Sequence, residues 1–229
     1  MKNILRPLIF GFALAAASSS VLAGAYDDLI AAVYRDDTNT VMDLVNRGMD
    51  VNSVDPTGNT LLHVAARNGN DALIAALIKQ KANPNARNRV GDTPLALAAY
   101  NGKKAAIDAL LTAGAQVNSP GWTALHYAVF AEHPEIVAYL LGKGAQVDLR
   151  APNQQTALML AAKNGNIEIV RMLLNAKADT RLKDQNDDTP LTLARQSNNS
   201  NVVQLLEQPA AVEPPAAAAK TPEGETGAK

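Results

Sequence analysis

The feature that most constrains this chain of 229 residues is a short segment that recurs at a nearly fixed interval. In each copy a Thr precedes small and apolar residues, and the copies begin 33, 30, 33 and 33 residues apart. The five anchoring residues are Thr60, Thr93, Thr123, Thr156 and Thr189. A unit of this length cannot bury its apolar face alone, so identical units stack on one another. The spacing therefore predicts a solenoid.

The copy from Thr93 to Gly102 predicts a short helix between two turns. The Thr93 hydroxyl can accept a hydrogen bond from an amide of the first helical turn, and Pro94 fits the first helical position, where its missing N–H has no cost. Gly102 is expected to end the helix, because glycine readily adopts the left-handed conformation there. Further Asn-Gly pairs at 68–69 and 164–165 keep the same interval and predict helix-to-helix turns.

A second marker follows the same interval. Gly48-Met49-Asp50-Val51-Asn52 recurs in related form at positions 81, 114, 144 and 177. Between the two markers, apolar residues at i, i+1, i+4 and i+5 predict a second helix in each unit. Both markers place a three-residue deletion between Val117 and Thr123, where we expect a shortened loop.

Together the two markers resemble the ankyrin-repeat family, over roughly residues 26–207 and in the form found in exported bacterial proteins. The resemblance implies an all-α solenoid of helix-turn-helix repeats with β-hairpin fingers, with about six repeats including the caps. Polar residues around Asp36 predict the N-terminal cap, and the polar run 196–201 predicts the C-terminal cap.

Residues 1–23 predict a different kind of segment. Lys2 and Arg6 precede an apolar run that ends in small residues, which is the pattern of a secretory signal peptide. Cleavage after Ala23 and cleavage after Ala25 both fit. The run falls short of the roughly 20 residues that span a bilayer, so we expect no stable membrane insertion after cleavage. The chain has no Cys, which favours a bacterial periplasm over secretion with disulfides.

The sequence divides into the signal peptide, a repeat domain at 24–207 and a tail at 208–229. The tail is rich in Pro, Ala, Glu and Lys and has few large apolar residues, so it is expected to be disordered. Loss of residues 1–23 removes two basic residues and no acidic one, which changes the formal net charge from −1 to −3. With this net charge, the sequence shows no basic patch of the kind that binds nucleic acid.

The sequence offers little for catalysis. His63 and His126 occupy a motif position that the resemblance assigns to structural hydrogen bonds, and His133 begins a second helix. No nucleophile, paired carboxylates or metal-ligand set is legible, so we expect no enzyme, cofactor or metal. The run from Asp184 to Asp188 resembles the start of a calcium loop but lacks its Gly and its closing Glu.

The resemblance implies binding on a concave face lined by the fingers and first helices. The finger positions are Asn59, Asp92, Trp122, Gln155 and Asp188. The helix positions are Arg67, Asn68, Tyr100, Asn101, Phe130, Ala131, Lys163 and Asn164. Tyr100, Trp122 and Phe130 fall together in adjacent repeats, as binding anchors would, although Trp122 could equally pack only on its neighbour. Tyr127 is expected to pack in the groove wall.

These features predict a monomeric, non-catalytic module that binds another protein, as a periplasmic scaffold or an enzyme accessory. A secreted effector that binds a host protein is an alternative. A hydrolase or a metal enzyme is a remote one.

Overall fold

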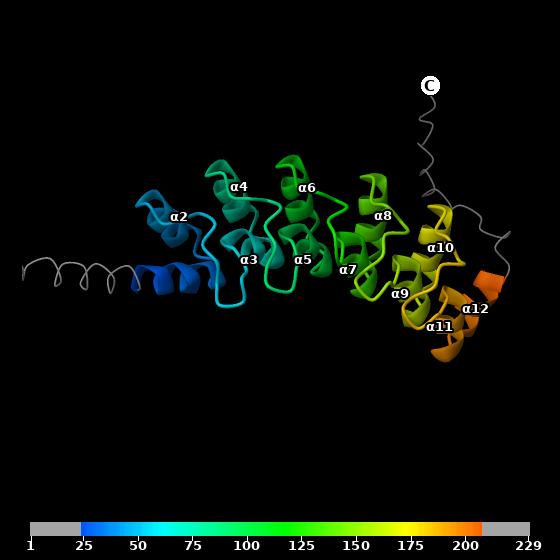
Figure 1. Cartoon of the computed structure of the whole chain (residues 1–229). Helices are drawn as coiled ribbons and strands as arrows, with labels where there is room; N and C mark the ends of the chain where they lie inside the picture. The colour runs from blue at the N-terminus through cyan, green and yellow to red at the C-terminus, as the bar shows by residue number, and fades with distance from the viewer. Residues whose placement is uncertain (1–23, 208–229) are drawn as a thin grey trace, which may run out of the picture.

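The computed structural model describes residues 24–207, and their helices form six pairs placed side by side in one row (Figure 1). The first helices of the pairs are residues 24–34, α3 (Leu61–Asn68), α5 (Pro94–Tyr100), α7 (Ala124–Phe130), α9 (Ala157–Asn164) and α11 (Pro190–Gln196). The second helices are α2 (Thr38–Asn46), α4 (Asp71–Lys79), α6 (Lys104–Thr112), α8 (Pro134–Gly142), α10 (Ile167–Asn175) and α12 (Ser200–Glu207). The predicted all-α solenoid of about six repeats is confirmed. The predicted signal peptide and tail lie outside the described residues.

The recurring threonines begin the first helices as predicted. Each Thr side chain accepts a hydrogen bond from the backbone amide three residues later, from Thr60 at α3 to Thr189 at α11. Pro94 occupies the first turn of α5. The Asn-Gly pairs end the first helices, with Gly69, Gly102 and Gly165 at φ values of 75°, 64° and 80°.

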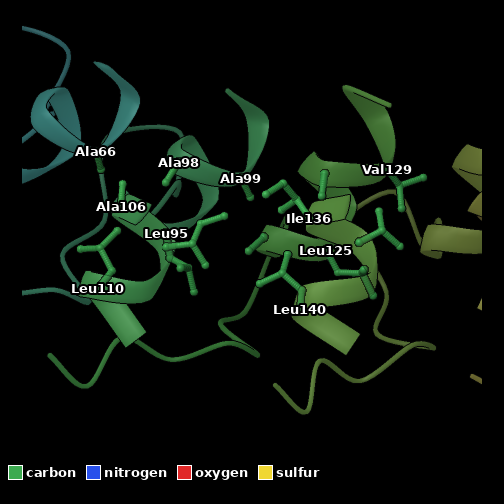
Figure 2. Close-up of a cluster of buried hydrophobic side chains, with 14 of the residues drawn as sticks. Ala66, Leu95, Ala98, Ala99, Ala106, Leu110, Leu125, Val129, Ile136 and Leu140 are labelled. Atoms are coloured by element: carbon green, nitrogen blue, oxygen red, sulfur yellow. The ribbon is translucent and has the colours of Figure 1, made fainter. Parts of the chain in front are cut away.

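The core is one continuous layer between the two rows of helices. Figure 2 shows how small side chains alternate with large ones: Ala66, Ala98 and Ala99 let neighbouring first helices approach closely, and leucines of the second helices fill the remaining space. Leu110, Ile136 and Leu140 are fully buried. Burial of such side chains stabilises the fold by about 1.5–3 kcal/mol each.

The fingers differ from the expected β-hairpins, because the described residues contain no strand and only one isolated bridge, between Val54 and Thr60. Four of the fingers are five-residue turns in which the amide of the first residue donates to the carbonyl of the fifth. These bonds join Asp55 to Asn59, Asn88 to Asp92, Ala151 to Gln155 and Asp184 to Asp188, at 2.8–3.0 Å. In each of these turns the amide of the fourth residue also donates to the carbonyl of the first, at 2.8–3.1 Å. Within the described chain, the loop between Val117 and Thr123 has no such bond, which fits the predicted deletion.

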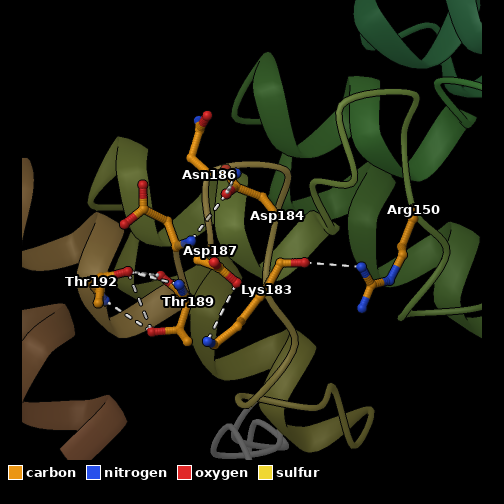
Figure 3. Close-up of polar contacts among 8 residues, drawn as sticks. Arg150, Lys183, Asp184, Asn186, Asp187, Thr189 and Thr192 are labelled. Carbon is orange, nitrogen blue, oxygen red and sulfur yellow. Dashed lines mark hydrogen bonds and ion pairs between the residues drawn. The ribbon is translucent and has the colours of Figure 1, made fainter.

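Side-chain hydrogen bonds, rather than strand pairing, stabilise the fingers and join them to one another. In the last finger, Asp184 Oδ1 accepts from the amides of Asn186 and Asp188 at 2.8 and 3.1 Å (Figure 3). Between fingers, the Arg150 guanidinium donates to the Lys183 carbonyl at 2.9 Å, and Arg87 donates to the Pro120 carbonyl at 2.8 Å. The Asp184 carboxylate therefore holds a turn. Within residues 24–207, no group of three or more His, Asp or Glu residues could hold a metal ion.

Candidate functional site

Four aromatic side chains of α5, α7 and the loop before α7 form one cluster, which we call the aromatic patch: Tyr100, Trp122, Tyr127 and Phe130. Tyr100 is the last residue of α5, Trp122 directly precedes the N-cap of α7, and Phe130 ends α7. The Tyr100 ring stacks on Phe130 with their centroids 6.2 Å apart, and the Trp122 ring meets Phe130 edge to face at 5.8 Å. Tyr127 lies 5.3 Å from Trp122 and 5.8 Å from Tyr100. The rings therefore touch one another, mostly at steep angles, and form one contiguous aromatic cluster.

The two outer rings of the aromatic patch face solvent. Tyr100 is 42% exposed and Phe130 48% exposed, whereas Trp122 is half-buried against the core. Tyr127 is anchored from below, because its hydroxyl donates to Asp92 Oδ1 at 2.6 Å. Burial, and then this contact with Asp92, raise the pKa of Tyr127 well above its usual range. The phenol is therefore a fixed neutral donor that holds the patch in place.

The other finger positions predicted for binding are engaged in contacts within the protein. Asn59 accepts from the amide of Asn88 at 2.9 Å, and Gln155 donates to Asp184 at 3.3 Å. Asp188 accepts from Gln196 at 2.9 Å, and Asp92 is only 9% exposed. These side chains join fingers to one another and to the helices, so their polar groups are partly committed to the scaffold.

Some of the predicted helix positions hold side chains that form hydrogen bonds within the protein, and others hold side chains that do not. Asn68 donates to Asp36 at 2.9 Å, Asn101 to the Leu97 carbonyl at 2.8 Å, and Asn164 to the Phe130 carbonyl at 3.4 Å. Ala131 is the C-cap of α7. The exposed Lys163 forms no ion pair within residues 24–207.

A smaller contact on the first repeats was not foreseen from the sequence. The Arg67 guanidinium lies over the Tyr34 ring, 5.2 Å from its centroid, and the Tyr34 hydroxyl donates to Asp55. Burial and this hydrogen bond raise the pKa of Tyr34. Burial also raises the pKa of Asp55, but hydrogen bonds from Thr57, Tyr34 and Asn59 outweigh it and hold the pKa far below its usual range. The first repeat does not follow the sequence pattern of the others, so the pattern did not predict this contact.

The histidines join neighbouring repeats. His63 bonds to Thr60 through Nδ1 and meets the Asp92 carbonyl through Nε2 at 3.0 Å. His126 does the same with Thr123 and the Gln155 carbonyl, at 3.2 Å. Burial lowers the pKa of both imidazoles. His133 Nε2 meets the Tyr100 carbonyl at 3.1 Å, so all three rings contact the backbone of another repeat.

Comparison with known proteins settles the family. A family model described as ankyrin repeats (3 copies) matches residues 29–120, 71–151 and 146–214. This chain belongs to the ankyrin-repeat family. Ankyrin repeats form protein–protein interaction modules, and they are a binding fold more typically than an enzyme fold. None of the helices within residues 24–207 combines the length and apolar character needed to cross a bilayer.

Several curated ankyrin-repeat relatives are much longer proteins. The nuclear factor NF-kappa-B p105 subunit of Gallus gallus is 32% identical over 58% of this chain and 14% of its own length. The palmitoyltransferase akr1 of Schizosaccharomyces pombe is 40% identical over 60% of this chain and 22% of its own length. The putative palmitoyltransferase ZDHHC13 of Danio rerio is 30% identical, again over 22% of its length. The chain spans less than a quarter of each, so the transferase names describe those proteins and not this one.

Proposed function

We propose that this ankyrin-repeat chain binds a segment of another protein on its concave face, with Tyr100, Trp122 and Phe130 as the anchors. The observation that carries the proposal is the aromatic patch, in which two half-exposed rings lie beside a half-buried Trp. Trp and Tyr are enriched among residues that dominate binding energies. The contacts that hold Tyr127 to Asp92 support the proposal, because a rigid patch loses little entropy when a partner binds.

The surroundings of the aromatic patch have the character of an interface rim. Lys163 and Asn164 are exposed polar side chains at the end of the next first helix, α9, and Asn101 follows Tyr100 directly. A typical interface has an apolar centre inside such a polar, solvent-accessible rim. Asn59, Arg67, Asn68, Gln155 and Asp188 extend the proposed face along the remaining repeats, as secondary contacts.

The proposed location is the bacterial periplasm, and the proposed role is that of a monomeric scaffold or enzyme accessory. The signal-peptide pattern of residues 1–23 and the absence of Cys support export to that compartment. Cell fractionation tests this part separately. Protein in the periplasmic fraction, shortened at Ala23 or Ala25, is the expected result, and full-length protein in the cytosol would refute it.

Affinity capture from the native host tests the binding function. The tagged chain, expressed with residues 1–23 intact, is cross-linked and purified, and its companions are identified by mass spectrometry. We expect one abundant companion, which the Tyr100→Ala, Trp122→Ala, Phe130→Ala triple variant loses. The identity of that companion separates a scaffold from an enzyme accessory.

Tyr139→Ala is the matched control for this capture, because it removes a partly buried aromatic ring from α8, a second helix. The control variant is expected to retain the companion. Equal recovery by the triple variant, at a thermal stability similar to that of the control, would disprove the site. A companion found only in a lysate of the cells that a secreted effector would target, and not in the native host, would favour the effector alternative instead.

A further inference from the structure

The fingers and first helices of the four interior repeats carry an unequal charge. These segments are residues 54–69, 87–102, 119–131 and 150–164. Their basic side chains are Arg67, Arg87, Arg89, Arg150 and Lys163. Their acidic side chains are only Asp55 and Asp92, and both of these are buried. This central part of the concave face is therefore basic, although the whole chain has a formal net charge of −1.

These basic side chains are not neutralised within the protein. None of the five forms an ion pair within residues 24–207. Arg87 donates to the Pro120 carbonyl at 2.8 Å, and Arg150 donates to the Lys183 carbonyl at 2.9 Å (Figure 3). Such contacts hold a guanidinium group in place but leave its charge uncompensated. A guanidinium that is already positioned loses less entropy when it binds a carboxylate, for which its planar fork is well suited.

The basic side chains lie on both sides of the aromatic patch along the row of repeats. Arg67 lies in the last turn of α3 and Lys163 in the last turn of α9, one repeat before and one repeat after the patch. Arg89 lies in the finger before Trp122, and Arg150 directly precedes the finger after it. From α3 to α9 there are three steps of packed helices, which span about 30 Å. An extended peptide covers that distance with about nine or ten residues.

The charge reverses beyond these repeats. Residues 24–50 hold six acidic and two basic residues, and residues 183–207 hold four acidic and two basic residues. A long polyanion such as a nucleic acid strand would meet repulsion at both ends, and it carries a charge at every nucleotide, including those that would lie over the aromatic patch. A peptide avoids both costs, because it can place carboxylates opposite the basic side chains and an apolar side chain opposite the rings.

We infer that the partner segment is an acidic peptide, an extended stretch of about ten residues with carboxylates towards both ends and an apolar side chain in the middle. The inference rests on the proposed function, since it names the chemistry of the segment that covers the aromatic patch. The apolar side chain contacts Tyr100, Trp122 and Phe130. The carboxylates pair with basic side chains on either side and so fix the position of the segment along the row of repeats.

Trp122 is the only Trp in the chain, so its fluorescence reports binding at the aromatic patch. The probe is a synthetic peptide with three glutamates at each end and Gly-Leu-Phe-Gly in the middle, titrated into the purified full chain. In one matched peptide glutamine replaces every glutamate, and in another alanine replaces the Leu and the Phe. Both matched peptides are expected to bind at least about tenfold more weakly. A rise in salt from about 0.05 M to about 0.3 M is expected to weaken only the peptides that carry glutamate.

Two double variants test the basic side chains themselves. Arg89→Gln, Lys163→Gln removes one charge from each side of the aromatic patch and is expected to weaken the binding of the glutamate peptide by about five- to tenfold. Lys79→Gln, Arg171→Gln is the matched control, because it removes the same charge from exposed positions on the second helices α4 and α10. The control is expected to bind within about twofold of the unmodified chain. Circular dichroism checks that both variants fold.

Equal affinities for the glutamate and glutamine peptides would overturn the inference, and so would an equal loss in the two double variants. Failure of the glutamate peptide to bind at about millimolar concentration, the weak limit for a specific contact, would overturn it as well. An oligothymidylate of the same length is titrated in parallel. Tighter binding of this strand than of the glutamate peptide would identify a nucleic acid as the occupant and would also overturn the inference.

The partner capture separates this inference from the proposed function. A companion that the aromatic triple variant loses is expected to be lost or weakened in Arg89→Gln, Lys163→Gln too. A companion lost only in the aromatic triple variant, and captured equally by the two double variants, would leave the proposed function standing and remove only the acidic character of the partner.

Discussion

At the scale of single residues, His63 and His126 couple the stability of the solenoid to pH. Burial holds the pKa of both imidazoles below the ordinary value of about 6.5. The unfolded chain therefore binds more protons than the folded chain just below pH 6.5. The stabilisation is complete above about pH 6.5 and is lost as the pH falls from there toward the folded pKa values.

We predict that the free energy of unfolding drops as the pH falls from about 6.5 to about 5.5, by up to about 1.4 kcal/mol per histidine for each pH unit between the folded and unfolded pKa values. Urea titrations at several pH values measure this slope. In the control His63→Thr, His126→Thr the slope is expected to flatten, because Thr192 fills the same position in α11 and bonds to the Thr189 amide at 2.7 Å. An unchanged slope would contradict the assignment.

Lys177 adopts a backbone conformation that suits glycine. Its φ is 67°, whereas the corresponding positions of other repeats hold Gly48, Gly114 and Gly144 at φ of 87° to 104°. A non-glycine residue in the left-handed region is strained. We predict that Lys177→Gly stabilises the protein by about 0.5–1 kcal/mol in urea unfolding, after the entropy cost of glycine is subtracted. The reverse change Gly144→Lys is the control and is expected to destabilise; the same sign for both would refute the explanation.

At the scale of elements, the deletion between Val117 and Thr123 alters the boundary between α6 and α8. A crevice of about 360 Å³ lies there, lined by Asp108, Leu111, Thr112, Ala115, Val117, Tyr139 and Lys143. The Tyr139 hydroxyl donates to the Asp108 carboxylate across it, and the Lys104 ammonium lies 4.3 Å from the centroid of the Tyr139 ring. One side chain of α8 thus ties two second helices together.

Tyr139→Phe removes only the hydroxyl, and we predict a loss of about 0.5–1.5 kcal/mol in the free energy of unfolding. Hydrogen exchange is expected to rise locally, in α6 and α8. Asp108→Asn retains an acceptor oxygen and serves as the milder control. Wild-type stability of Tyr139→Phe would show that the hydrogen bond contributes nothing.

The sequence predicted the helices well and the fingers less well. Thr93, Pro94 and Gly102 act within one turn of backbone, so their roles could be read from spacing alone. The finger turns depend instead on contacts over about 33 residues, such as Arg150 to the Lys183 carbonyl. A local pattern carries no information on whether backbone or side chain makes such a bond.

At the scale of the whole molecule, each pair of helices contacts only its neighbours, so the interior pairs carry the stability. Leu140 in α8 is fully buried between two neighbouring pairs, whereas Leu206 in α12 is 7% exposed at the end of the described row. We predict that Leu140→Ala lowers the free energy of unfolding by about 2–5 kcal/mol. Leu206→Ala is expected to loosen α11 and α12 alone.

Hydrogen exchange distinguishes these two outcomes. The Leu206→Ala variant is expected to exchange faster at the C-terminal pair, with the interior first helices unchanged. Uniformly faster exchange along residues 24–207 would contradict the neighbour-only picture.

Part of the candidate site could be predicted from the sequence. The family pattern placed Tyr100, Trp122 and Phe130 on one face, but it could not show that the rings touch or that Asp92 anchors Tyr127. That anchor joins residues 35 positions apart through the packing of α5 on α7. The same packing commits the side chains of Asn59 and Gln155 to neighbouring fingers, which spacing alone left open.

Site-specific photocrosslinking in the native host is the measurement that tests the central claim most directly. A benzophenone amino acid replaces Phe130 in one strain and Tyr139 in another, since the first lies in the aromatic patch and the second on a second helix. Irradiation is expected to join one companion protein to the Phe130 position and none to the Tyr139 position. Crosslinking that is equal at both positions, or that occurs only at Tyr139, would contradict a binding site on the concave face.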